Sequence, residues 1–103
     1  MPEASFGRAT RWLTTMTMDP ELLNANRTDL VNYLNQYNIE SRPVWKPLHL
    51  QPLFKNIDYY THDIDMDISR RLFFNGICLP SDTKMSVETQ GFVIEKVKDF
   101  LKL

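Results

Sequence analysis

The chain has 103 residues, of which 12 are basic and 13 acidic, and its formal net charge is −1. This length allows one small domain, with an expected radius of gyration of about 13 Å. A content of 43% hydrophobic and 24% charged residues is typical of a soluble globular protein and excludes disordered, collagen-like and membrane-embedded chains.

The charge pattern, the cysteine content and the first residues limit which partners and which cellular location we expect. Basic and acidic residues are interleaved along the chain, so it lacks the clustered positive charge with which proteins bind nucleic acids. Cys78 is the single cysteine, and no apolar run approaches the roughly 18 residues of a membrane span. Residues 1–5 do not resemble a signal peptide. We therefore expect a cytoplasmic protein with neither nucleic acid nor membrane as a partner.

Residues 11–18 are predicted to form the first strand, because their side chains alternate and are rich in β-branched and aromatic types. Asp19 and Pro20 end it, since proline has no amide proton and disfavours helix at the residue before it.

A helix is predicted to begin after Asn26, which can cap it, with Asp29 near its positive end. The helical spacing places four side chains on one buried face: Leu30, Tyr33, Leu34 and Tyr37. Asn38 is suited to the left-handed conformation that ends a helix.

Residues 39–45 are predicted to form a second strand, and Pro43 confines it to a sheet edge or to the end of the strand. The proline-bounded segment that follows leaves room for little more than a helical turn. His49 is therefore expected on a loop or a short helix.

A third helix is predicted over residues 63–75 from the four-residue spacing of Ile64, Ile68 and Leu72. Acids would lie in its first turn and Arg70 and Arg71 in its last, as the helix dipole favours. Gly76 ends this helix.

Residues 77–80 form a predicted apolar strand closed by proline, and Ser86 caps a last helix. The core-facing residues of that helix are predicted to be Val93, Ile94, Val97, Phe100 and Leu101. The whole order, β-α-β-α-β-α, predicts a two-layer α/β (α+β) sandwich in which helices cover a short three-stranded sheet. The spacing leaves parallel and antiparallel pairing open.

Asp63, Asp65 and Asp67 have the spacing that opens a calcium-binding EF-hand loop. The loop also needs glycine at its sixth position and glutamate at its twelfth, where this chain has Ile68 and Phe74. We therefore interpret the three acids as the start of a helix.

Other catalytic arrangements are also missing. His49, His62 and Cys78 lack the short spacings of zinc ligands, and Ser81 and Ser86 lack the glycines that surround a nucleophilic serine. We predict no metal site and no catalytic residue in this chain.

The most concentrated chemistry lies in residues 42–49, where Arg42, Trp45, Lys46 and His49 occur together. An indole offers a flat face to a sugar or base, arginine and lysine donate to phosphate, and histidine donates, accepts or shuttles a proton. The alternative interpretation is an aromatic anchor surrounded by solvated charges.

Three segments of the chain resemble, in order and spacing, the C-terminal domain of the DegT/DnrJ/EryC1/StrS family: RWLTTM, NIESRPVWKPLHLQPLFK and LFFNGICLPSDTKMSVETQGFVIEKV. The resemblance extends from about residue 8 to residue 97 and departs from the family at Asp82, where glycine is usual. Members are pyridoxal-phosphate-dependent aminotransferases of nucleotide-linked keto sugars. The resemblance implies that residues 1–103 form the small C-terminal domain of the aspartate-aminotransferase fold.

The same resemblance implies a parent enzyme that transfers an amino group from glutamate to a nucleotide-linked keto-deoxysugar in polysaccharide or glycan biosynthesis. Its pyridoxal-phosphate-binding large domain, which carries the Schiff-base lysine, is absent from this sequence. No lysine of the chain matches that motif, so the chain is expected to be an inactive fragment that binds no cofactor.

The partners implied by the resemblance are the large domain, a second subunit of a homodimer, and the nucleotide-sugar substrate. Arg42, Trp45, Lys46 and His49 would face that substrate. An apolar surface would remain exposed, for which the candidates are Phe6, Trp12, Trp45, Phe54, Tyr59 and Tyr60. The rival hypothesis is a free-standing protein- or glycan-interaction module that uses the Trp45 edge.

Overall fold

The computed structural model describes residues 3–10, 12–63 and 65–103. Its strands β1 (Thr14–Thr17), β2 (Arg42–Pro43) and β3 (Gly76–Leu79) form one sheet in the order β1-β3-β2. Both pairs are antiparallel, which settles the direction of pairing and makes the fold α+β. The predicted three-stranded sheet and the edge position of the Pro43 strand are confirmed.

The observed strands are shorter than predicted. Arg11, the first residue of the predicted first strand, lies outside the described residues, and β1 begins at Thr14. Only two residues of the predicted strand 39–45 belong to β2. One further bond follows, from the Val44 amide to the Gly76 carbonyl at 3.1 Å.

The helix predicted after Asn26 is α2 (Arg27–Asn35), and Asn26 and Asp29 form a reciprocal capping box. Asn38 has the expected left-handed backbone, with φ of 57°. The Ile39 amide then donates to the Leu34 carbonyl at 3.1 Å, and both of these side chains are buried in the core. A four-residue helix that we did not predict, α1 (Pro20–Leu23), precedes α2 and is capped by Asp19.

The predicted apolar face of α2 is correct in its centre and wrong at its end. Leu30 and Leu34 are fully buried and Tyr33 is half-buried. Tyr37 lies past the last helical residue and is 39% exposed. Its ring contacts Tyr33 instead, at 5.1 Å between ring centroids.

Helix α3 (Ile68–Asn75) begins five residues later than predicted, and Asp67 caps it by accepting from the Arg70 amide. Asp63 instead accepts from the Asp65 amide at 2.9 Å, a local turn that competes with helix. With this start Arg70 lies in the first turn and no basic residue in the last, so the predicted match to the helix dipole is wrong.

The apolar spacing that predicted α3 does not mark a core face. Ile64 lies outside the described residues, while Ile68 and Leu72 are exposed. Gly76 ends α3, as predicted. The strand β3 begins at Gly76 and ends at Leu79, one residue earlier at each end than the predicted strand 77–80.

The last helix is α4 (Val87–Leu101), and the Ser86 side chain accepts from the Thr89 amide, which confirms the predicted cap. Val93 is buried, and Val97, Phe100 and Leu101 pack against the core. Ile94 is half-exposed, so its predicted place in the core is wrong because it lies one position off the inward face.

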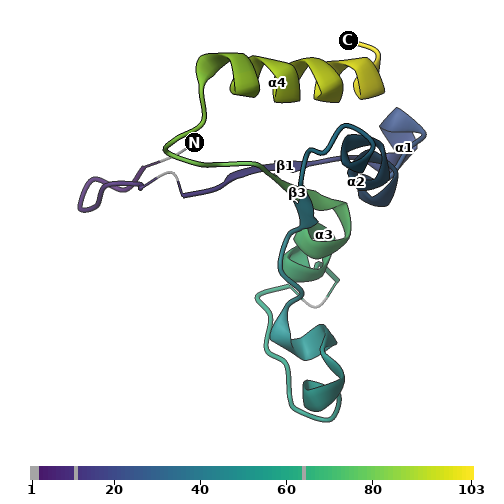
Figure 1. Ribbon diagram of the computed structural model, residues 1–103. Coiled ribbons are helices and arrows are strands. Elements are labelled where there is room, and N and C mark those ends of the chain that lie inside the picture. The colour runs from purple at the N-terminus through teal and green to yellow at the C-terminus, as the bar shows by residue number, and fades with distance from the viewer. Residues whose placement is uncertain (1–2, 11, 64) are drawn as a thin grey trace.

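The core lies where α2 and α4 pack against one face of the sheet, and Figure 1 shows α4 along one side of the strands with α2 next to them. Its buried residues are Met18, Leu30, Leu34, Ile39, Ile77 and Val93.

The molecule is more extended than a compact chain of its length, with a radius of gyration of 16.1 Å where about 13 Å is expected. Figure 1 shows two projections: the N-terminal loop of residues 3–10, and a segment of residues 45–63 that contains the short 3₁₀ helices η1 (Leu48–Leu50) and η2 (Pro52–Phe54). We call residues 45–63 the arm. Of the six aromatic residues predicted to be exposed, Phe54 is half-buried. The other five are exposed: Phe6, Trp12, Trp45, Tyr59 and Tyr60.

Candidate functional site

A hollow of about 650 Å³ is bordered by two tryptophans. Trp12 and Trp45 contact each other with ring centroids 5.7 Å apart and planes tilted by 33°. We call this hollow the tryptophan groove; its lining is Trp12, Leu13, Glu40, Ser41, Arg42, Pro43, Trp45, Cys78, Leu79, Pro80 and Ser81. Two predicted site residues, Arg42 and Trp45, therefore lie in one groove.

The sheet register places the two sides of the groove on either side of β3. Thr14 pairs with Leu79 on one side of β3, and Arg42 pairs with Cys78 on the other. By this register Trp12 lies beside the chain that follows β3, and Trp45 lies toward the start of β3. The contact between the two indoles therefore depends on how their side chains reach toward each other. Sequence reasoning did not assign Trp12 to the site, because 33 positions of chain separate the two indoles.

Polar groups of the groove lie on its rim and in its wall. The exposed Arg42 guanidinium donates from Nε to the Glu40 carboxylate at 2.8 Å. Such a solvent-exposed pair contributes little stability and is readily exchanged for a ligand. Ser41 is buried, and within the described part of the chain its hydroxyl has no hydrogen-bond partner.

Lys46 lies where the chain leaves the groove and enters the arm. Its side chain is exposed, and its carbonyl accepts from the Gln51 side-chain amide at 3.1 Å. This bond closes the turn that leads into η1.

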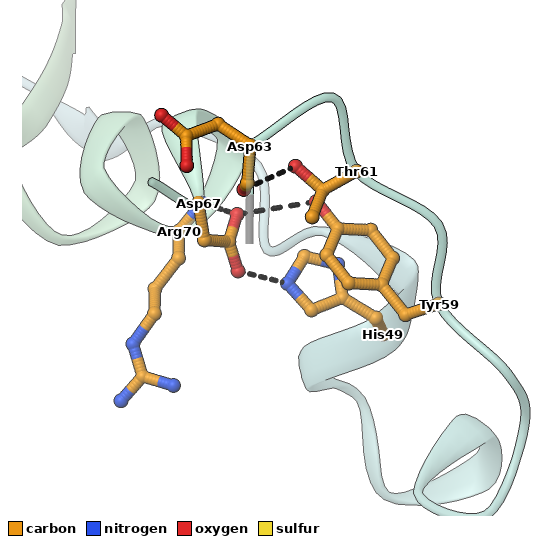
Figure 2. A network of polar contacts seen from close by, with 6 residues as sticks. All are labelled: His49, Tyr59, Thr61, Asp63, Asp67 and Arg70. Carbon is orange, nitrogen blue, oxygen red and sulfur yellow. Dashed lines mark hydrogen bonds and ion pairs between the residues drawn. The ribbon is translucent and has the colours of Figure 1, made fainter. Parts of the chain in front are cut away.

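His49 is located in a second place, on η1 in the arm, and Figure 2 shows its contacts. Its Nε2 lies 2.7 Å from Oδ2 of Asp67, and its ring stacks on Tyr59 with centroids 3.8 Å apart and planes inclined by 16°. The His49 side chain is only 16% exposed. His49 thus lies on a short helix, as predicted, but its side chain is packed and not free in solvent.

Asp67 is held by three donors. Oδ1 accepts from the Arg70 amide at 2.8 Å and from the Tyr59 hydroxyl at 3.2 Å, and Oδ2 is paired with His49. Burial alone would raise the pKa of this carboxyl, but the hydrogen bonds from Arg70, His49 and Tyr59 outweigh it and lower the pKa. Asp67 is thus an anionic acceptor at neutral pH. We call His49, Tyr59 and Asp67 the histidine cluster.

Sequence reasoning treated Asp67 only as a helix-start acid and Tyr59 only as an exposed aromatic. Both are partners of His49, from which Asp67 is separated by 18 residues. Local patterns carry no signal for such a contact.

No metal centre emerges from the acidic segment. Asp63 is used by the Asp65 amide and Asp67 by His49, so the carboxylates do not converge. Within the described ranges, no group of three or more His, Cys, Asp or Glu side chains could hold a metal ion. Among the helices of the described residues, none is both long and apolar enough to cross a membrane.

We also tested the described residues for a fit to pyridoxal phosphate. The cofactor needs a lysine that faces a pocket, and no lysine lines the tryptophan groove. The Lys96 ammonium is held by Glu95 at 2.9 Å and Asp99 at 3.0 Å on the surface of α4. The described residues therefore do not fit the cofactor.

The α+β domain, with its aromatic groove and its histidine cluster, has known relatives. The DegT/DnrJ/EryC1/StrS aminotransferase family matches residues 2–98. The chain therefore belongs to this family, which confirms the resemblance drawn from its sequence.

Individual relatives agree. EpsN of Bacillus subtilis (strain 168), assigned by name as a pyridoxal phosphate-dependent aminotransferase, is 47% identical over 95 residues, 92% of this chain and 24% of that protein. GDP-perosamine synthase of Escherichia coli O157:H7 is 35% identical over 74 residues, 72% of this chain and 19% of that enzyme.

A solved structure extends the likeness to the fold. Spr1654 of Streptococcus pneumoniae, assigned by name as a sugar aminotransferase and solved in its PMP form, has a TM-score of 0.66 and 26% identity; the match covers 87% of this chain and 22% of that one. This confirms the predicted fold class. The chain spans a quarter or less of the length of these three relatives.

Proposed function

We propose that this chain is the C-terminal small domain of a pyridoxal-phosphate-dependent aminotransferase that transfers an amino group from glutamate to a nucleotide-linked keto-deoxysugar. The observation that carries the proposal is the family match over residues 2–98. The name of one relative, GDP-perosamine synthase, supports a nucleotide-linked sugar as the substrate class. Polysaccharide or glycan biosynthesis would use the product.

In this proposal the chain contributes one wall of the substrate cleft and no catalytic residue. Trp45 presents a flat apolar face to a sugar or base, and 62% of it is exposed. Arg42 and Lys46 are exposed donors on either side of it, suited to the phosphates of a nucleotide sugar. His49, in the arm, supplies a hydrogen bond to the sugar or to a phosphate.

Pyridoxal phosphate, when bound to the large domain, supplies the electron sink for amino transfer. The residues of this chain would bind and orient the sugar nucleotide and limit the access of water to it. The large domain and a second subunit would cover the exposed aromatic side chains, with Phe6 and Tyr60 the most exposed. A cytoplasmic homodimer is part of the same proposal.

A domain exchange tests the proposal. Residues 2–98 of this chain would replace the matching segment of EpsN, to which they are 47% identical over 95 residues. We expect the chimera to bind pyridoxal phosphate and to release 2-oxoglutarate from glutamate when a nucleotide-linked keto sugar is supplied. Unaltered EpsN serves as the reference. A folded, cofactor-loaded chimera without this activity would contradict the proposal.

Site variants in the active chimera test the assigned residues. Loss of a hydrogen bond to a charged group lowers kcat/KM by about 10- to 150-fold. We expect this loss for Arg42→Ala and His49→Ala with cofactor binding unchanged. Lys55→Ala, an exposed lysine of the same arm, is the matched control. If Arg42→Ala and His49→Ala stay within about twofold of the parent chimera, these residues do not contact the substrate.

A protein- or glycan-interaction module remains the second candidate, favoured by the two exposed indoles of the tryptophan groove. Such a module would bind a glycan or protein without any aminotransferase domain. Both tryptophans of the chain lie in the groove, so intrinsic fluorescence reports occupancy directly. Saturable quenching by an oligosaccharide that lacks a nucleotide, together with an inactive chimera, would favour this candidate.

A further inference from the structure

We propose that Asp67 is a positioning residue for His49: it holds the imidazole through Nε2 and leaves Nδ1 as the ring nitrogen that meets a ligand. The proposal rests on the proposed function, which assigns His49 to the substrate site. The predicted site residues all lie within residues 42–49, and the proposal adds Asp67, which lies outside this segment, to the site.

The Asp67 carboxylate is fixed before it meets His49. As the N-cap of α3, it accepts from the Arg70 amide at 2.8 Å, so its position is set by the helix. Its second oxygen then lies 2.7 Å from Nε2 of His49, and both side chains are mostly shielded from solvent, at 16% and 24% exposure. Figure 2 shows the carboxylate between the helix start and the imidazole. The arm is thereby joined to α3 at one point.

Tyr59 completes the restraint. Its ring covers one face of the imidazole at a centroid distance of 3.8 Å, and its hydroxyl donates to Oδ1 of Asp67 at 3.2 Å. Stacking fixes the plane of the imidazole, and the bond to Asp67 fixes its rotation within that plane. The His49 ring therefore has one orientation before any ligand arrives.

This orientation determines which atom is available. A carboxylate only accepts, so the neutral imidazole keeps its proton on Nε2 and carries its lone pair on Nδ1. Among the described residues Nδ1 has no hydrogen-bond partner, and it is not one of the buried polar atoms that lack one. Among the described residues, none therefore competes with a ligand for Nδ1. This nitrogen can accept from a sugar hydroxyl, or donate to an anionic oxygen when the ring is protonated.

Two substitutions separate positioning from helix capping. Serine is as good an N-cap as aspartate, so Asp67→Ser keeps the start of α3, but its side chain is too short to reach Nε2. Asp67→Asn keeps the cap through its single amide oxygen and presents an NH₂ donor to Nε2 at the same reach. The imidazole can then stay in place only with its proton on Nδ1. Asp65→Asn removes a nearby exposed carboxylate and is the matched control. The exposed His62 is an internal reference in every variant.

Imidazole NMR of the chain without ligand, at about pH 8.5, tests the positioning. We expect an inter-ring Overhauser contact between His49 and Tyr59, and exchange of the Nε2 proton slowed about tenfold or more relative to His62, as a hydrogen bond to a charged group implies. Asp67→Ser should abolish both signals, Asp67→Asn should keep the ring contact but lose the Nε2 proton, and Asp65→Asn should change neither. If Asp67→Ser keeps both signals, packing alone holds His49 and the proposal fails.

Addition of GDP-mannose at millimolar concentration tests the ligand atom separately. We expect the Nδ1 signal of His49 to move in the parent chain, and Asp67→Ser to weaken the apparent binding by about tenfold while Asp65→Asn retains it. If the ring is held by Asp67 but Nδ1 does not respond in the parent, the assignment of His49 to the substrate is wrong. That outcome differs from a failure of the positioning proposal, which would already appear in the NMR signals of the chain without ligand.

Discussion

Gly76 provides the sharpest test of the packing around β3. Its backbone φ is −93°, which any residue adopts, so glycine is not required there by conformation. A Cβ on Gly76 would instead lie 2.6 Å from Cγ2 of Val44 and still closer to the Leu72 carbonyl oxygen. The Leu72 oxygen belongs to the α3 backbone and cannot rotate away, so helix and strand must separate to admit a methyl group.

Overpacking of a core costs about 1–3 kcal/mol, and a backbone collision places Gly76→Ala near the upper end of that range. For a domain of this size, about 3 kcal/mol lowers Tm by more than about 10 °C. Thermal and urea unfolding followed by circular dichroism measure the change. Gly91→Ala is the matched control, because Gly91 is exposed on α4 with nothing within 4 Å of an added Cβ. Alanine there should stabilise the chain by about 0.5–1 kcal/mol through its helix propensity.

The two glycine variants must therefore differ in sign. Equal changes in the free energy of unfolding for Gly76→Ala and Gly91→Ala would refute the close approach of α3 and Val44 to β3.

Four further predictions follow from contacts described above. Ser86→Ala removes the cap of α4 and should cost about 1 kcal/mol of unfolding free energy in urea, whereas Ser86→Asp should keep it. Lys96→Met removes two ion pairs but keeps an aliphatic side chain over Tyr37, so Tm should fall at low salt, with the difference from the parent shrinking at about 1 M salt. The lowered pKa of Asp67 means that its ionised form stabilises the fold above its unfolded pKa of about 3.9. That stabilisation is lost as the pH falls through the pKa of the folded state. The advantage of the parent over Asp67→Asn in urea unfolding should therefore be constant above about pH 5 and shrink below about pH 4. Mixed with pyridoxal phosphate, the chain alone should show no borohydride-sensitive imine absorbance between about 400 and 430 nm.

Contrary outcomes are equally definite. An unchanged urea midpoint for Ser86→Ala, a salt-independent loss for Lys96→Met, or a parent advantage over Asp67→Asn that grows in acid would each contradict the contact concerned. A borohydride-sensitive band would show that a lysine of this chain binds the cofactor.

The parts of the fold that were predictable are those that depend on near neighbours. Helix ends are set by residues that act on backbone groups within a few positions, so the residue types alone locate these ends. The examples are Asn26 with Asp29, Asn38 after α2, and Ser86 before α4. Pro43 acts through its missing amide, which places β2 at an edge irrespective of its partner. These predictions are confirmed.

The predictions are wrong where the structure depends on contacts between distant residues, or on local hydrogen bonds that compete with a helix. The start of α3 depends on a turn at Asp63 that no helical spacing reveals. In the same way, the contacts of His49 with Asp67 and of Trp12 with Trp45 join residues far apart in the sequence and depend on how the chain folds back. The chain alone could nominate His49 and Trp45 as site residues, but it could not name the side chains that hold them.

The proline in β2 also determines where this sheet can grow. The Val44 amide points inward to Gly76, and because successive residues of a strand alternate, the nitrogen of Pro43 points outward, where an incoming strand would need a donor. That edge is therefore closed to strand addition. The opposite edge, along Thr14–Thr17, has no such block, so misassembly between copies of the sheet would begin at β1.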